Sequence, residues 1–358
     1  MKKKIKIAEI GPYPPPDTGW SVRIKKVKTA LEAKGYQCTV LNTGKNRKEK
    51  SPHYMDVQSG FDYLLKLFLL KLKGYRFHIH TNAQAVKGPI LCLIAHCVSL
   101  LFFSRAKVTF HGGNKQLYFP VANAGKIYPV IYLNFLLSKN MICNDESIKD
   151  LISSYGFGIR RDKIHPIQAF SSQYVDFTET SLPAELTAFI NDKRIFIFSY
   201  IALRNGFYLE TLCEFIENCD PKTGIVLTGC GKVEDPEIKL IYERLLKLEQ
   251  DGKVFLIKAL SHDEFMTAAK QADIFLRTPD SDGVSASVLE ALSLGTVVVA
   301  SENYKRPDSV VTYTPDDAMD LGRQVNLVIS RQSEFEDKIV RPEIKDTVDD
   351  EIAVLLKD

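Results

Sequence analysis

Two carboxylates eight residues apart are the side chains of this sequence best suited to binding a polyhydroxylated ligand. Asp282 lies in a turn beside Gly283. Glu290 lies in an expected helix over 286–294, which begins after the N-cap candidate Ser285. The free N–H groups of that first helical turn form an anion site, and Gly283 allows the backbone to approach a ligand closely. The same spacing also fits an ordinary turn with a capping serine and a surface glutamate, and it leaves the two interpretations open.

The elements that must position these residues alternate between strand and helix along the whole chain. Strands are expected over 5–10, 38–42, 77–81, 107–111, 194–201, 224–229, 253–259, 273–278 and 296–301. Helices are expected over about 22–34, 90–104, 208–218, 236–250, 262–271 and 286–294. This alternation predicts βαβ units and parallel, doubly wound sheets in an α/β fold.

The length of 358 residues is enough for two domains, and a loop-rich stretch at 168–183 separates the two series of elements. We predict one Rossmann-like domain over 1–170 and a second over 171–346, with the last helix, within 347–358, completing the first. Ligands of parallel sheets bind at the carboxyl ends of the strands. We therefore expect the site in a cleft where the two sheets face each other.

Composition and charge exclude some classes of protein and indicate the kind of partner. Hydrophobic residues make up 45% and charged residues 25%, which excludes a fibre or a disordered tail. Residues 1–170 contain 27 Lys and Arg against 10 Asp and Glu, whereas residues 171–358 contain 20 against 34. A basic half indicates an anionic partner, such as nucleic acid, a phosphorylated ligand or acidic lipid. Because no nucleic-acid module is evident, we expect no nucleic-acid partner.

The cysteines and the apolar segments favour a cytoplasmic protein. The seven cysteines form no C-x-x-C pair, and their odd number predicts neither a zinc site nor a disulfide framework. The basic start lacks the apolar core of a signal peptide. The longest apolar run, 88–104, is shorter than a membrane-spanning helix requires.

The segment 61–76, FDYLLKLFLLKLKGYR, places three lysines among leucines and phenylalanines. One interpretation is a helix in a membrane interface, attracted by anionic lipid with about 1 kcal/mol per basic residue. The other is a crossover helix on the sheet, whose lysines extend along apolar surface to water: Lys66, Lys71 and Lys73. Both remain open, and peripheral contact with anionic membrane at its inner face is kept as a hypothesis.

The segment DIFLRTPDSDGVSASVLEALSLGTVVVAS resembles the E-x7-E region of retaining GT-B glycosyltransferases of family 4. The resemblance implies that Asp282, as a catalytic residue, holds the transferred hexose and that Glu290 binds the nucleotide ribose. It also implies that the turn and the helix start bind the donor through Gly283, Val284 and Ser285.

Two N-terminal stretches resemble further motifs of that family. GPYPPPDTGWSVRI is similar to its first P…GG loop near the donor phosphates, with Gly19 as the first glycine and Trp20 where the second is usual. VTFHGG contains His111, which matches a histidine that the family places near the reacting sugar and which is therefore expected to be catalytic. The alternative for His111 is a hydrogen-bonded histidine in a buried turn.

Two stretches of the second half also resemble donor-binding motifs. VLTGCG is similar to the family's G-x-G turn and implies Gly231 as a donor-binding residue. KVFLIKALSHDEF is similar to the strand and loop that bind the nucleotide base, at Lys258, Ala259 and Leu260.

One departure from the family concerns the cations for the diphosphate. The family usually carries an Arg and a Lys in G-R-x-x-x-x-K-G, but Tyr200 and Asn205 stand at those positions here. Arg204 lies one position from the Lys site, and its guanidinium fork suits phosphate. The alternative for Arg204 is a solvated loop residue.

No metal site or cofactor is expected. His78 and His80 alternate on one face of a strand without nearby cysteine or carboxylate spacing, and we interpret them as structural. Asp280 and Asp282 form a D-x-D pattern, which in the other glycosyltransferase fold holds Mg²⁺ or Mn²⁺. We discount that interpretation because the pattern lies late in the chain, directly before the LEA…G helix.

The resemblance implies a retaining, metal-independent hexosyltransferase in the assembly of cell-surface polysaccharide or glycoconjugate. The expected donor is a nucleoside-diphosphate sugar, a UDP-sugar first, and the expected acceptor is a glycan or a lipid-linked sugar. Two alternatives remain open. One is a non-catalytic GT-B homologue that binds a glycan or a partner, and the other is a GT-B enzyme such as a nucleotide-sugar epimerase.

Overall fold

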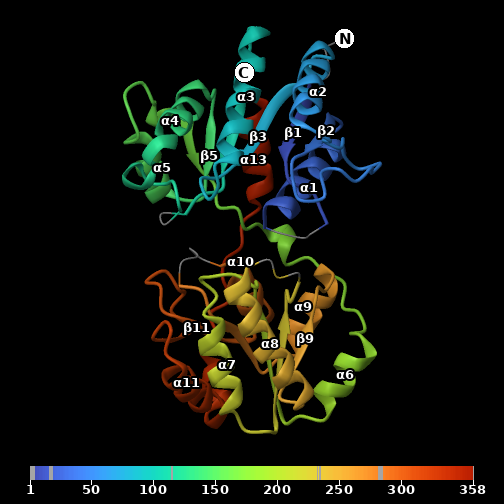
Figure 1. The fold of residues 1–358 in the computed structure, drawn as a ribbon, viewed down its shortest axis with the longest axis vertical. Helices are drawn as coiled ribbons and strands as arrows, with labels where there is room; N and C mark the ends of the chain where they lie inside the picture. Colours follow the sequence, from blue (N-terminus) through green and yellow to red (C-terminus); the bar gives the residue numbers. More distant parts are fainter. Residues whose placement is uncertain are drawn as a thin grey trace. The chain divides into compact units, whose positions relative to one another are not determined.

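The chain folds into two units, each built on one parallel sheet (Figure 1). The first unit comprises Met1–Gln173 and Ile344–Asp358, and the second comprises Tyr174–Glu343. The computed structural model describes residues 5–15, 19–113, 116–231, 233, 235–280 and 285–357.

The first unit has a six-stranded sheet in the order β2-β1-β3-β4-β5-β6. Its strands are β1 (Lys6–Gly11), β2 (Gln37–Asn42), β3 (Arg76–Thr81), β4 (Lys107–Phe110), β5 (Met141–Cys143) and β6 (Ile164–Pro166). Its helices are α1 (Gly19–Ala33), α2 (Gly60–Leu72), α3 (Lys87–Leu101), α4 (Tyr128–Leu137), α5 (Glu146–Ser153) and α13 (Thr347–Leu356). Short 3₁₀ turns lie at Val121–Asn123, Gly125–Ile127, Arg161–Lys163 and Ser172–Tyr174.

The second unit repeats this plan in the order β12-β11-β10-β7-β8-β9. Its strands are β7 (Ile195–Tyr200), β8 (Thr223–Thr228), β9 (Val254–Ile257), β10 (Ile274–Arg277), β11 (Val297–Ser301) and β12 (Val311–Tyr313). Its helices are α6 (Ala184–Asn191), α7 (Leu209–Glu217), α8 (Pro236–Gln250), α9 (His262–Gln271), α10 (Ala286–Leu294), α11 (Ala318–Ser330) and α12 (Gln332–Asp337). In both units the first strand lies inside the sheet, which is the doubly wound arrangement.

The central strands are apolar on both faces because helices cover both faces of each sheet. On β7, Ile197 packs in one cluster with Leu227, whereas its neighbours Phe196 and Phe198 pack in a second cluster with Val226. Successive side chains of a strand point to opposite faces, so a continuous apolar run fills two cores at once. This explains why these strands show runs such as IFIF rather than alternation.

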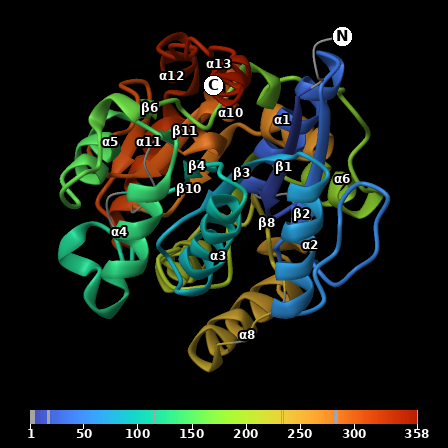
Figure 2. The same ribbon diagram turned by 90° about the horizontal axis from the view of Figure 1, so that it is seen from above.

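The last helix, α13, belongs to the first unit and packs beside α1 (Figures 1 and 2). The apolar contacts join Val348 and Ile352 to Val27 and Leu31. A buried ion pair adds to them, because Arg23 Nε lies 2.6 Å from Glu351 Oε2 and both side chains are 1% exposed.

Two further contacts fix the ends of α13. The Arg23 guanidinium donates to Thr347 Oγ1 at 3.0 Å and to the Thr347 carbonyl at 2.7 Å. At the other end, Lys107 Nζ donates to the carbonyls of Val354 and Leu355 at 2.8 Å. A cation at the carbonyl end of a helix is favoured by the helix dipole.

Several elements were not expected from the sequence. They are the three-residue strands β5, β6 and β12 and the helices α4, α5, α6, α11 and α12. A run of three residues is too short to show a period of two, so only the pairing of these strands with longer neighbours defines them. Within the described ranges, none of the helices combines the length and the apolar character needed to cross a membrane.

We predict that Arg23→Met destabilises the first unit by about 3–5 kcal/mol, because it leaves the Glu351 carboxylate buried without its cation. Urea unfolding can be followed by the fluorescence of Trp20, the one tryptophan of the sequence, which lies in the first unit.

The matched control is Lys28→Met, which removes a partly exposed pair with Glu32 from the same helix and is expected to cost at most about 1 kcal/mol. Equal losses for the two variants would show that the buried pair does not anchor α13.

Candidate functional site

The carboxyl edge of the second sheet gathers most of the residues that the sequence indicated. Arg204 follows β7, Gly231 follows β8, and Ser285 follows β10. Lys258, Ala259 and Leu260 follow β9; the first two are exposed and Leu260 is half-buried against the core. Ligands of parallel sheets bind at this edge, so the second unit has a candidate site of its own.

Two arginines meet one aromatic ring at this edge. The guanidinium carbon of Arg204 lies 5.2 Å from the centroid of the Phe207 ring, and that of Arg277 also lies 5.2 Å from it. The two cationic groups are therefore no more than about 10 Å apart. Arg204 is exposed, whereas Arg277, the last residue of β10, is buried and donates to the Tyr200 carbonyl at 3.4 Å.

A third arginine joins neighbouring strand ends. Arg306 Nε donates to the Ser301 carbonyl at 3.0 Å, and its Nη2 donates to the Pro279 carbonyl at 2.5 Å. Nearby, Thr278 follows β10 and its buried hydroxyl has no hydrogen-bond partner in the described part of the chain. A buried polar atom in that state is a group that a ligand can satisfy.

In the turn after β8, the backbone requires a glycine at position 229 but not at position 231. Gly229 has a φ of 96°, and a Cβ there would collide with the backbone oxygen of Ile201. The N–H groups of Gly229 and Cys230 both donate to the Ile257 carbonyl at 3.1 Å, which ties the turn to β9. A Cβ at Gly231 would lie 4.0 Å from the backbone oxygen of Gly229, an ordinary contact, so this position imposes no comparable steric requirement.

The helix α10 begins at Ser285, which has the extended backbone of an N-cap residue. Its side chain makes no capping bond, and its hydroxyl lies 3.0 Å from that of Ser287. Glu290, one turn further, is 8% exposed, and its carboxyl group has no hydrogen-bond partner among the residues described. Burial raises the pKa of Glu290 to about 8. The other predicted residues of this segment, Asp282, Gly283 and Val284, lie outside the described residues.

Gly19 and His111 lie in the first unit, apart in sequence from this edge but close to one another. Gly19 begins α1, and the adjacent Trp20 stacks on His111 with ring centroids 4.7 Å apart. His111 is 8% exposed, and its Nε2 lies 2.9 Å from Nδ1 of His80. The structure thus brings Gly19 and His111 together and places the remaining predicted residues with described positions in the second unit.

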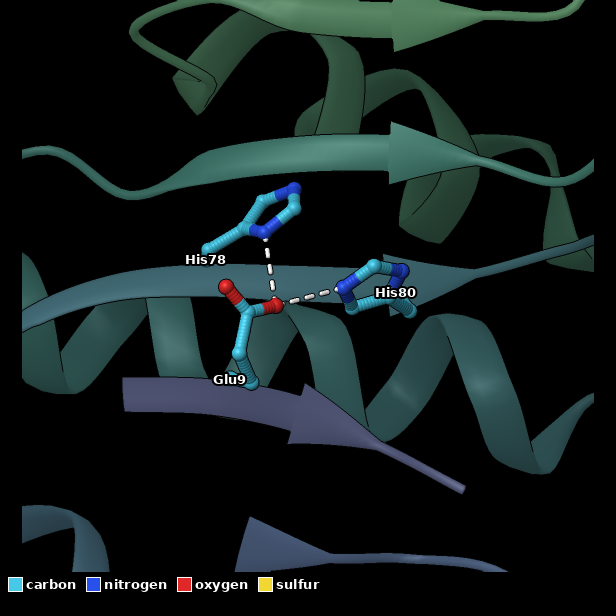
Figure 3. A group of neighbouring side chains, drawn as sticks. All are labelled: Glu9, His78 and His80. Carbon is cyan, nitrogen blue, oxygen red and sulfur yellow. Dashed lines mark hydrogen bonds and ion pairs between the residues drawn. The ribbon is translucent and has the colours of Figure 1, made fainter. Parts of the chain in front are cut away.

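A carboxylate lies beside His78 and His80 in the fold, although none stands near them in the sequence. Glu9 Oε2 lies 2.7 Å from His78 Nδ1 and 2.7 Å from His80 Nε2, so both bonds converge on one oxygen (Figure 3). The parallel register places Glu9 directly opposite His78, although 69 residues separate them in the sequence. The potential ligand atoms of Glu9, His78 and His80 all lie within 4.8 Å of one another. This spacing and the residue types also suit a metal ion.

Three functional candidates escaped the sequence reasoning: Glu9, Arg277 and Arg306. Arg277 carries a signal that was available, because it is a charged residue that ends an otherwise apolar buried strand, DIFLRT. Glu9 is likewise a charged residue inside a buried strand, β1, where it is 0% exposed. A charge inside a buried strand requires a partner, and that requirement marks such positions for attention.

Comparison with known proteins agrees with the fold. Residues 187–341, within the second unit, match the family model described as Glycosyl transferases group 1. Anabaena HepE, solved in complex with UDP and glucose, has a TM-score of 0.73 at 12% identity, over 98% of this chain and 99% of that chain. A glycosyltransferase from Rickettsia africae has a TM-score of 0.66 at 14% identity, over 99% and 100%.

An enzyme of another class shares the architecture. A solved UDP-N-acetylglucosamine 2-epimerase has a TM-score of 0.62 at 13% identity, over 99% of this chain and 95% of that chain. Curated protein sequences give no match. The predicted fold class, two Rossmann-like domains of GT-B architecture, is confirmed. The chain therefore has the fold of these solved proteins, and the greater part of its second unit matches the family model of glycosyl transferases group 1.

Proposed function

We propose that this protein is a retaining, metal-independent glycosyltransferase that takes a hexose from a UDP-sugar and passes it to a glycan or a lipid-linked acceptor. The observation that carries the proposal is the family match over 187–341, which covers the sheet edge with its arginines. The solved HepE complex with UDP and glucose supports UDP as the nucleotide. A role in cell-surface polysaccharide or glycoconjugate assembly is part of the proposal.

The diphosphate is assigned to Arg204 and Arg277. Both guanidinium groups flank Phe207, each with its central carbon 5.2 Å from the ring centroid. A guanidinium presents parallel N–H donors that match phosphate oxygens. Because the Arg277 side chain is already held by Tyr200, its charge is preorganised for the leaving diphosphate, where such stabilisation contributes most.

The ribose is assigned to Glu290, together with the helix start at Ser285. In the free protein Glu290 keeps its proton at pH 7, because burial disfavours the carboxylate. Two ribose hydroxyls that donate to this carboxyl would stabilise its ionised form. Binding of the donor is therefore coupled to loss of the Glu290 proton.

An epimerase is the second candidate, because the shared architecture with a solved UDP-N-acetylglucosamine 2-epimerase covers nearly the whole chain. The two reactions differ in what they consume. A glycosyltransferase needs an acceptor, because it releases UDP and joins the sugar to that acceptor. An epimerase changes the configuration of the sugar nucleotide with no acceptor present.

We predict that Arg204→Met and Arg277→Met each weaken UDP binding about 10- to 100-fold, since each removes charge-assisted bonds to phosphate. Isothermal titration measures the dissociation constants. Arg277 is buried, so its replacement can unfold the protein, whereas Arg204 is exposed and its replacement is expected to leave the fold intact. The Arg204 variant therefore tests the assignment even if the Arg277 variant does not fold.

Arg323→Met is the matched control, because Arg323 is an exposed arginine on α11 of the same unit. Unchanged UDP affinity in both test variants would contradict the diphosphate assignment. No binding of any nucleoside diphosphate by the wild type would instead favour a non-catalytic homologue.

A second prediction concerns protons. At pH 7, binding of UDP-glucose should release most of one proton, since the phosphates of this ligand do not titrate near neutrality whereas Glu290 does. The measurement is the binding enthalpy in buffers of different ionisation enthalpy. Glu290→Gln should remove the buffer dependence, and an equal dependence in wild type and variant would refute the ribose assignment.

We also propose that the first unit contacts anionic membrane from the cytoplasmic side. A line of exposed apolar residues runs along α2, at Phe61, Leu65, Leu69 and Leu72, while the opposite side of the helix is buried through Tyr63, Leu67 and Leu70. The fully exposed Phe103 lines a cavity of about 600 Å³ together with six basic side chains: Lys71, Arg76, Arg105, Lys107, Lys139 and Lys163. Apolar residues beside concentrated positive charge match the chemistry of an anionic bilayer surface.

The third prediction tests this surface by flotation with phosphatidylcholine vesicles that contain or lack phosphatidylglycerol. The wild type should float with the anionic vesicles alone, and the double variant Lys139→Glu and Lys163→Glu should partition about tenfold less. The control is Lys239→Glu with Lys247→Glu, which makes the same charge change on α8. Equal flotation with anionic and neutral vesicles would overturn the membrane proposal. An equal decrease of vesicle binding in both double variants would overturn it as well.

A further inference from the structure

A chain of buried polar groups runs across the first sheet and ends at His111. Glu9 on β1 binds His78 and His80 on β3 (Figure 3). His80 Nδ1 in turn lies 2.9 Å from His111 Nε2. The strand register places Glu9 opposite His78 and His80 opposite Thr109, so these side chains share one face of the sheet. The chain of hydrogen bonds determines where each proton lies.

The proton count starts at Thr109, which has a single hydroxyl hydrogen. That hydrogen is donated to Glu351 Oε1 at 2.9 Å, so the bond between Thr109 Oγ1 and His78 Nε2, at 2.8 Å, must use a hydrogen of the histidine. The other nitrogen of His78 donates to Glu9. His78 therefore carries both ring protons and a positive charge.

Charge neutrality supports this assignment. The cluster contains the carboxylates of Glu9 and Glu351 and the cations Arg23 and His78, so the charges balance among side chains at most 1% exposed. Burial alone would raise the pKa of Glu9, but the charge of His78 and the bonds from both histidines outweigh it and lower the pKa to about 2. Burial opposes the charged form of His78, yet Glu9 raises its pKa above the ordinary value.

A divalent ion in place of the His78 proton would leave an excess of positive charge in this buried cluster. A further cation that acts on His78, Lys107, directs its ammonium group to the carbonyl end of α13. The hydrogen-bonding distances of 2.7 Å from Glu9 to both histidines are explained by protons alone. The cluster thus favours a protonated His78 over a metal ion.

The remaining protons follow from Glu9. His80 Nε2 donates to Glu9, and burial together with the charge of His78 lowers the pKa of His80, so its Nδ1 has no proton. That nitrogen must accept a hydrogen from His111 Nε2. Burial and then the neighbouring His80 lower the pKa of His111 well below its ordinary value, and the charges of Glu351, Arg23 and His78 act on it more weakly. His111 is left with an unprotonated Nδ1, for which no hydrogen bond is found within the described residues.

We propose that Glu9 and His80 are positioning residues that fix His111 as its Nε2–H tautomer, so that Nδ1 accepts a hydrogen bond from a hydroxyl group of the sugar substrate. The sugar ligand rests on the proposed function, whereas the tautomer does not. Trp20 covers one face of the His111 ring and Nε2 is occupied by His80, so Nδ1 is the ring nitrogen that remains for a ligand.

The direct test is nitrogen-15 NMR of histidine-labelled full-length protein, which distinguishes protonated from unprotonated ring nitrogens. We expect both nitrogens of His78 protonated and only Nε2 protonated in His80 and His111. A proton on Nδ1 of His111, or a stoichiometric metal ion in the purified protein by elemental analysis, would overturn the proposal.

Variants separate positioning from mere structural support. Glu9→Gln and His80→Gln should mix the His111 tautomers and lower kcat for sugar transfer about tenfold, with little change in KM for the donor. Ser138→Ala is the matched control, because it removes a buried hydrogen bond of the same unit, from Ser138 to the Asn134 carbonyl, that lies outside the cluster of Glu9, His78, His80 and His111. Equal effects of Ser138→Ala on tautomer and kcat would contradict the positioning role.

The outcomes also separate this inference from the proposed function. The expected tautomers in a protein that transfers no sugar would refute the transferase and leave the protonation scheme standing. Active transfer with the opposite His111 tautomer would refute the scheme and leave the transferase standing.

Discussion

Parallel strand pairing is the constraint on which both units depend. In a parallel sheet the carboxyl ends of all strands lie at the same edge. In the second unit this brings the turns after β7 and β8 near Arg277, which ends β10. Parallel pairing also sets the register of residues within the strands. Glu9 meets His78 because the apolar runs of β1 and β3 align, and no local sequence signal links the two.

Burial then decides the protonation state of each acid. In the first unit the carboxylates of Glu9 and Glu351 are buried even more deeply than Glu290, but cations and hydrogen-bond donors beside them keep both ionised. In the second unit Glu290 has no such neighbours in the described part of the chain, and it keeps its proton at neutral pH. The same residue type is therefore a fixed charge in one unit and a protonated acid in the other.

The sequence predicted the regular parts of the molecule well, because long central strands carry continuous apolar runs. The expected strand over 77–81 differs from β3 by one residue at its start, and the one over 224–229 is displaced from β8 by one residue at both ends. Short edge strands such as β12 could not be predicted, since their existence depends on a neighbour that is distant in the sequence. Local motifs indicated Ser285 and Glu290, and the structure places them at the start of α10 and within it, while their roles stay predictions. The partners of His78 and the position of Arg277 beside Phe207 depend on the strand register, which only the folded sheet supplies.

The central claim is that the arginines at the edge of the second sheet bind a nucleoside diphosphate. A crystal structure of the protein with UDP tests it most directly. The account predicts phosphate oxygens at about 3 Å from the guanidinium nitrogens of Arg204 or Arg277, with the ribose at Glu290. Phosphates bound elsewhere on the protein, with this edge filled by water alone, would contradict it.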